Sequence, residues 1–204
     1  MLWPAALSWR GIMPGGSGRH ETRVESRIAL GIGSRCPLDL GVFLSIWTDP
    51  ERTKSVMVRT LYDWWSANAG SAGIPDRSAF DPIEHRLLMP NVMITEVETE
   101  PFRLRYRLVG TRVVANLGTD FTGRYLDELI GPDFKVPWLD YYRQAYAERR
   151  PLMGALTEPT KTGNTFTYEF GLFPVARSGT EVKQFIALED YFDFKLTSGA
   201  LAGL

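Results

Sequence analysis

The chain has 204 residues, of which 44% are hydrophobic and 23% are charged, and its formal net charge is -1. These values are typical of one soluble globular domain and exclude a largely disordered or membrane-embedded chain. The near balance of 23 basic and 24 acidic residues also argues against nucleic-acid binding through a global basic field.

The single cysteine, Cys36, cannot form an intramolecular disulfide, which fits a reducing compartment. The N-terminus lacks the cationic region and the long apolar run of a secretory signal. The other apolar run, residues 38–47, is too short to span a membrane. We therefore expect a cytoplasmic protein without a membrane span.

Residues 1–47 are rich in Gly, Ser, Arg and Pro and show no sustained periodicity, so we expect this extension to be poorly ordered. Two interpretations stay open: a flexible interaction arm, or an extension upstream of the true start of the protein. The domain itself is predicted over residues 48–194, and residues 195–204 are expected to be a flexible tail.

The first helix is predicted from about Pro50 to Asn68, because Asp49 is a good N-cap and Pro50 suits the first helical position. Its apolar stripe is wide enough to contact two partners. The tryptophans either pack on the sheet of the same chain or seal a homodimer, as aromatic anchors often do. The residues proposed for a dimer or partner interface are Met57, Leu61, Trp64 and Trp65.

A second, short helix is predicted to start at Asp81, as part of a capping box, and to end before Pro90. His85 lies on it without a second histidine or a cysteine at ligand spacing. We interpret His85 as a surface or capping residue. No metal site is expected.

Two strands are predicted next, over residues 91–99 and 102–109, with a turn at Glu100-Pro101. In the second strand, apolar residues alternate with arginines, so one face is expected to point inward.

A tight hairpin between these strands places Glu98 opposite Arg103 and Glu96 opposite Arg105. Cross-strand ion pairs of this kind contribute about 0.2 to 1 kcal/mol each. We favour this interpretation of the arginines over a phosphate-binding or nucleic-acid patch, which calls for basic residues without neutralising partners.

Three helices are predicted after this hairpin, over residues 111–117, 124–129 and 136–149. The first two are too short to be stable alone and must pack on the apolar face of the second strand. The space they enclose is a candidate ligand pocket lined by Leu104, Tyr106, Leu108, Val113, Val114, Leu117, Phe121, Tyr125, Leu129, Tyr142 and Phe170.

The remaining chain is predicted to form three strands, over residues 151–158, 165–174 and 181–192. Sequential antiparallel strands with helices grouped between them indicate an α+β domain.

This order of elements resembles the PAS sensor domain, in particular a proteobacterial branch that often occurs as a single-domain protein. The matching segments are LYDWWSANAG, DPIEHRLLMPNVMITEV, FRLRYRLVGTRV, LGTDFTGRYLDEL and TYEFGLFPVARSGTEVKQFIAL, and they span roughly residues 58–190. The most specific positions are Gly110-Thr111, Gly118, Asp120, Thr122-Gly123 and Tyr125-Leu126. The resemblance implies a five-stranded antiparallel sheet with short helices on one face, a ligand between them, and signalling through dimers that use the N-terminal helix.

The cofactors of better-understood PAS domains do not fit this sequence. Flavin-photochemistry PAS domains carry a reactive cysteine after the first hairpin, and residues 111–129 contain none. Haem-binding PAS domains supply an axial histidine beside the sheet, and residues 111–149 contain none. The sequence thus argues against haem and covalent flavin, and the identity of any cofactor stays unknown.

We found no phosphate loop, GxSxG, HExxH or paired cysteines, so catalysis is not expected. The sequence predicts a sensory and signal-transduction module that acts by small-ligand binding and protein contact, as a homodimer with a signalling protein in trans. The alternative is a ligand-free dimerisation or adaptor protein whose pocket is filled by side chains. Because the chain ends soon after its last strand, we expect no fused effector domain.

Overall fold

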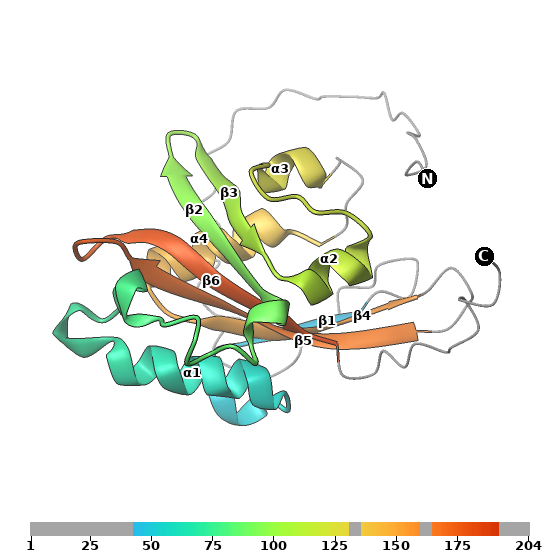
Figure 1. Ribbon diagram of the computed structural model, residues 1–204, viewed down its shortest axis with the longest axis horizontal. Helices are drawn as coiled ribbons and strands as arrows, with labels where there is room; N and C mark the ends of the chain where they lie inside the picture. Colours follow the sequence, from blue (N-terminus) through green and yellow to red (C-terminus); the bar gives the residue numbers. More distant parts are fainter. Residues whose placement is uncertain (1–42, 131–135, 160–164, 192–204) are drawn as a thin grey trace, which may run out of the picture. The chain divides into compact units, whose positions relative to one another are not determined.

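A computed structural model describes residues 43–130, 136–159 and 165–191 (Figure 1). The predicted C-terminal tail and residues 1–42 of the predicted extension lie outside the described residues.

Within the described residues, six antiparallel strands form one sheet in the order β1-β4-β5-β6-β2-β3. The strands are β1 (Phe43–Trp47), β2 (Val92–Thr99), β3 (Phe102–Val109), β4 (Leu152–Pro159), β5 (Thr165–Ala176) and β6 (Val182–Asp190). The helices are α1 (Val56–Asn68), α2 (Thr111–Leu117), α3 (Leu126–Leu129) and α4 (Trp138–Glu148), with short 3-10 turns that include η1 (Pro50–Arg52), η3 (Arg77–Ala79) and η4 (Met89–Asn91). The predicted antiparallel α+β class is confirmed.

The sixth strand, β1, is the main departure from the predicted five-stranded sheet. It pairs with β4 along its whole length, from Phe43 opposite Thr157 to Trp47 opposite Met153. The buried Trp47 donates a hydrogen bond of 2.9 Å from Nε1 to Thr53 Oγ1. The prediction of poor order was therefore wrong for residues 43–47. Five residues without clear alternation give no strand signal until a neighbouring strand supplies the hydrogen bonds.

The two faces of the sheet are covered by different helices (Figure 1). Phe170 points to α4, where its ring meets Trp138 at 4.8 Å between centroids. The next residue, Gly171, points to α1, since a Cβ there would lie 3.1 Å from Val58. We call the face covered by α2 and α4 the inner face, and the face on which α1 packs the outer face.

The helix predicted from Pro50 is divided into η1 and α1. The Ser55 hydroxyl accepts a hydrogen bond of 3.1 Å from Val58 N, so Ser55 is the N-cap at which α1 begins. The C-terminal end at Asn68 agrees with the prediction.

The prediction of a short helix from Asp81 is wrong, because residues 82–88 form consecutive turns. Asp81 Oδ1 accepts a hydrogen bond of 2.7 Å from Ile83 N, as in an Asx turn. Ile83 and Leu87 are both 76% exposed and Leu88 alone of these three is buried, so the segment does not pack a continuous apolar face on the core. A helix this short needs such packing to be stable.

The register of the β2–β3 hairpin agrees with the prediction, with Glu98 opposite Arg103 and Glu96 opposite Arg105. The turn contains the cis peptide bond Glu100-Pro101. Helix α2 also matches its predicted bounds and ends at Gly118, which has a φ of 75°.

Candidate functional site

The inner face of the sheet carries an aromatic layer between the strands and the helices. Tyr106 meets Phe121 at 4.6 Å between ring centroids, and Tyr142 of α4 meets Phe185 of β6 at 5.0 Å. Both pairs are T-shaped and all four residues are buried. Such pairs contribute about 0.5 to 1.5 kcal/mol beyond the area they bury.

A group of polar side chains lies within this apolar layer. The Tyr191 hydroxyl donates a short hydrogen bond to Glu189 Oε2. Burial raises the pKa of the Tyr106 hydroxyl, and the nearby Glu189 carboxylate raises it further. Burial likewise raises the pKa of Tyr142, with smaller contributions from Tyr106 and Glu189. One carboxylate therefore acts on three tyrosines that belong to different parts of the chain.

Two further polar atoms of the inner side are buried without a hydrogen-bond partner among the described residues. They are Thr95 Oγ1 of β2 and Asn116 Nδ2 of α2. Burial raises the pKa of the Tyr191 hydroxyl and Glu189 raises it further, while the nearby Asn116 side chain opposes this shift, although the geometry leaves Nδ2 unbonded. Buried polar groups are nearly always paired, so these two atoms offer hydrogen bonds to a small molecule or a water. The inner polar cluster consists of Thr95, Tyr106, Asn116, Tyr142, Glu189 and Tyr191.

The buried tyrosines make the protein sensitive to alkaline pH. Tyr106 and Tyr142 keep their protons in the folded state at pH values where the unfolded chain, with a tyrosine pKa of about 10, releases them. Above about pH 10 the unfolded state therefore binds fewer protons, and the free energy of unfolding falls as pH rises. Below this pH the contribution is fully present.

We expect Tyr142→Phe to reduce this alkaline loss by up to about 1.4 kcal/mol per pH unit above pH 10. Urea unfolding at pH 8 and at pH 10.5 measures the loss in each protein, so the value at pH 8 is the internal control. If the free energy of unfolding fell by the same amount in the variant and the wild type, the raised pKa of Tyr142 could not be a cause of the alkaline loss.

Most of the predicted pocket residues lie on the inner face, but not all. Leu104, Tyr106, Val113, Phe121, Tyr142 and Phe170 are buried there, and Val114 and Leu129 are half-buried. Leu117 was wrongly predicted as a lining residue, because it is 55% exposed. It occupies the last turn of a seven-residue helix, and the helical pattern alone does not show which side meets the sheet.

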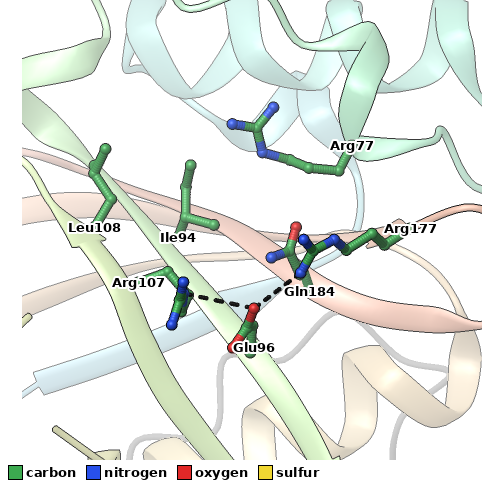
Figure 2. Close-up of a pocket in the computed structure, with 7 residues that line it drawn as sticks. All are labelled: Arg77, Ile94, Glu96, Arg107, Leu108, Arg177 and Gln184. Carbon is green, nitrogen blue, oxygen red and sulfur yellow. Dashed lines mark hydrogen bonds and ion pairs between the residues drawn. The ribbon is translucent and has the colours of Figure 1, made fainter. Parts of the chain in front are cut away.

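Leu108 was also placed wrongly, because β3 contains a bulge. Ile94 pairs with Leu108 but Thr95 pairs with Tyr106, so Arg107 is the extra residue. The bulge turns Leu108 to the outer face, where Figure 2 shows it beside Ile94 in a shallow pocket. Strict alternation along β3 had placed it on the same face as Tyr106.

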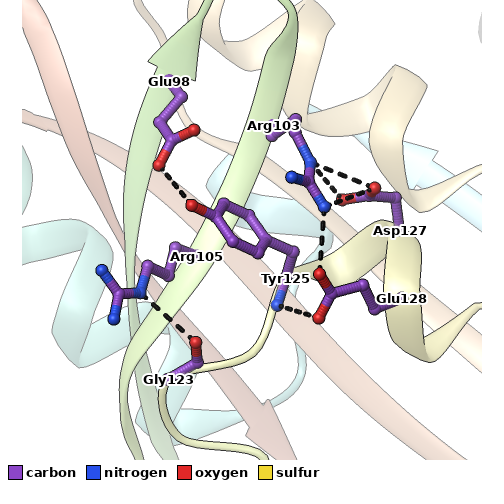
Figure 3. A network of polar contacts seen from close by, with 7 residues as sticks. All are labelled: Glu98, Arg103, Arg105, Gly123, Tyr125, Asp127 and Glu128. Carbon is purple, nitrogen blue, oxygen red and sulfur yellow. Dashed lines mark hydrogen bonds and ion pairs between the residues drawn. The ribbon is translucent and has the colours of Figure 1, made fainter.

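Tyr125 is the third predicted pocket residue that does not line the inner face (Figure 3). Its segment runs along the free edge of β3, with a hydrogen bond of 2.9 Å from Tyr106 N to Arg124 O. The Tyr125 hydroxyl donates to Glu98 Oε1 at 2.7 Å, and the Arg103 guanidinium lies 3.7 Å from its ring centroid. Tyr125 therefore holds the segment before α3 against the β2–β3 hairpin.

The arginines of β3 do not form the predicted ion pairs with their cross-strand neighbours. Arg103 instead binds Asp127 at 2.8 Å and Glu128 at 3.2 Å (Figure 3). These acids belong to α3, which follows the edge of β3. Because α3 lies beside β3, the carboxylate of Asp127 can accept two hydrogen bonds from the Arg103 guanidinium. The prediction considered only the two strands of the hairpin and therefore did not include this partner.

The four predicted interface residues of α1 have different environments. Leu61 and Trp65 are buried in the core, and Trp65 Nε1 donates a hydrogen bond of 2.7 Å to Pro174 O. Assigning these two to a dimer interface was wrong, since the sheet of the same chain covers them. Trp64 packs at the surface beside Phe80, and Met57 is half-buried.

Sequence reasoning missed four members of the inner polar cluster: Thr95, Asn116, Glu189 and Tyr191. A signal for two of them exists, since Thr95 and Glu189 are polar residues at inward-facing positions of apolar strands. Among the described residues, no group of three or more histidines, cysteines and carboxylates is placed to hold a metal ion. No described helix combines the length and apolarity that crossing a membrane requires.

The antiparallel sheet, with short helices over a partly polar inner face, defines an α+β domain. A family model described as PAS domain matches residues 53–188, and the chain belongs to this family. No curated protein matches the chain.

The chain is similar in fold to solved light-receptor structures at 16% sequence identity. For the light state of the blue-light photoreceptor Aureochrome1 LOV, the TM-score is 0.38, and 53% of this chain and 85% of that chain are covered. For an RNA-binding Light-Oxygen-Voltage receptor, the TM-score is 0.41, with coverage of 59% and 35%.

Proposed function

We propose that this PAS domain is a non-catalytic sensory module that binds a small molecule noncovalently at the inner polar cluster. The observation that carries the proposal is the pair of buried atoms Thr95 Oγ1 and Asn116 Nδ2, which have no hydrogen-bond partner among the described residues. A ligand that accepts a hydrogen bond from Asn116 and presents a flat apolar surface to the aromatic layer suits this environment.

A ligand-free adaptor is the second candidate function. The T-shaped pairs Tyr106–Phe121 and Trp138–Phe170 already fill part of the inner side, which favours a core packed by side chains. In both cases we propose a homodimer and output to a signalling protein in trans. The accessible part of the proposed interface is Met57 and Trp64, which are both half-buried, and Val56, which precedes Met57, is 77% exposed.

Native mass spectrometry of the protein purified from its own host tests the proposal. We expect a dimer that carries a reproducible extra mass per chain, and an absorption spectrum of the same sample shows whether that mass is a flavin or another chromophore. A dimer without extra mass would overturn the ligand proposal and favour the adaptor.

A matched pair of variants locates the ligand. Thr95→Val removes the unpartnered hydroxyl without changing the shape of the side chain, so the extra mass should fall several-fold while thermal stability is retained. Thr119→Val, at an exposed position, should keep the extra mass. Equal occupancy in both variants would show that the ligand does not bind at the inner polar cluster.

A further inference from the structure

A pocket lies on the outer face of the sheet, and none of its lining residues belongs to the inner polar cluster (Figure 2). It has a volume of about 340 Å³, at the lower end of the range for small-molecule sites. Strands β2, β3 and β6 form its floor, and η3 and the turn after β5 form its rim. Its lining residues are Arg77, Ile94, Glu96, Arg107, Leu108, Arg177 and Gln184.

The lining contains three guanidinium groups and one carboxylate. Glu96 Oε1 lies 3.5 Å from Arg107 Nε and 3.1 Å from Arg177 Nη1 (Figure 2). Arg77 Nη1 donates a hydrogen bond of 3.0 Å to a neutral group, Phe80 O. Burial lowers the pKa of Arg77, and the positive charge of Arg177 lowers it further. The single carboxylate thus leaves the pocket with an excess of positive charge.

The two rim segments that carry Arg77 and Arg177 are held together by Asp76. Its Oδ1 accepts from Ser78 N at 2.9 Å and its Oδ2 accepts from Ser178 N at 2.7 Å. A backbone hydrogen bond of 2.9 Å from Ala176 N to Pro75 O joins the same segments. The Asp76 carboxylate also favours the charged form of Arg77. Residues about 100 positions apart in the sequence are therefore positioned before any ligand arrives.

The floor of the pocket contributes an unused acceptor. Gln184 is only 6% exposed, and its Oε1 has no hydrogen-bond partner in the part of the chain that the structure describes. Figure 2 shows the Gln184 amide between Arg77, Arg177 and Glu96. A ligand that satisfies this oxygen must donate a hydrogen bond as well as carry negative charge.

We propose that this outer-face pocket binds a phosphate group that carries, or lies next to, an O–H donor. Arg107 and Arg177 share the one carboxylate of Glu96 and Arg77 is not bonded to it, so the three guanidinium groups keep donors available for phosphate oxygens. The O–H donates to Gln184 Oε1. The occupant is free phosphate or a small organic phosphate, and the site is independent of ligand binding on the inner face.

The test is a titration of the uniformly 15N-labelled chain, followed by NMR at pH 7 and constant ionic strength. Inorganic phosphate and glycerol phosphate are the two probes, and the tighter one identifies the source of the phosphate group. Sulfate is the comparison anion, since it has the same shape and a higher mean charge but no O–H at this pH. We expect saturable shifts at the lining residues and about tenfold weaker binding of sulfate.

Three variants make the test specific. Arg177→Ala changes a side chain that is 63% exposed, so the fold should be unaffected while phosphate binding weakens about tenfold. Gln184→Leu should remove the preference for phosphate over sulfate. Arg112→Ala, at an exposed position on α2, is the control and should bind as the wild type does. Shifts that do not saturate, or that are equal in Arg177→Ala and the wild type, would overturn the proposal, and so would equal binding of phosphate and sulfate by the wild type.

Discussion

Gly110→Ala is expected to lower the free energy of unfolding by about 3 kcal/mol, at the upper end of the range for overpacking. Gly110 lies between β3 and α2, where its N–H donates a hydrogen bond of 2.8 Å to Val92 O. An added Cβ would lie 2.6 Å from the carbonyl carbon of Pro90 and 2.7 Å from Met89 O. Both atoms belong to the backbone of η4, so no side-chain rotation relieves the overlap.

The same substitution should also affect the inner polar cluster, because α2 begins at the residue after Gly110 and carries Asn116. Urea unfolding measures the stability change. Gly179→Ala is the matched control, since a Cβ there meets nothing within 4 Å, and its stability should stay within about 0.5 kcal/mol of the wild type. Equal stabilities of Gly110→Ala and Gly179→Ala would show that η4 moves away at little cost.

Glu169→Ala is expected to destabilise the protein by about 3 kcal/mol, because it removes two hydrogen bonds at the N-terminus of α1. Glu169 is 3% exposed, and its Oε2 accepts hydrogen bonds from Lys54 N at 2.9 Å and Ser55 N at 2.7 Å. Hydrogen bonds to a charged group contribute about 1.5 to 3 kcal/mol each, and the variant leaves two backbone donors unsatisfied. These bonds attach the N-terminus of α1 to β5.

Glu169→Gln is the matched control, because it keeps an acceptor at the same position. Its neighbour across the strands is Asp190, whose Oδ2 accepts from the Ser55 hydroxyl at 2.7 Å. Removing one of two adjacent carboxylates also relieves repulsion, so we expect Glu169→Gln to lose less than half of what Glu169→Ala loses. Chemical unfolding of the three proteins at pH 7 decides this. Equal losses would show that the negative charge matters more than the acceptor.

The amino-acid sequence by itself determined the local elements of this protein. The period of two in residues 102–109, with the short turn before it, predicted the hairpin register in which Glu98 faces Arg103. The Gly residues around residues 111–117 predicted α2 within its observed bounds. These features depend on backbone sterics and on side chains a few residues apart, so a single segment carries the information.

Only the tertiary structure decided which side chains meet. The bulge at Arg107 turned Leu108 to the outer face, and α3 replaced Glu98 as the partner of Arg103. Arg77 and Arg177 lie in one pocket because the segments that carry them adjoin, and Glu189 affects Tyr106 because β6 lies beside β2. These contacts join positions from about 14 to 100 residues apart. Packing, strand order and a single inserted residue determine them, and none of these has a local pattern in the sequence.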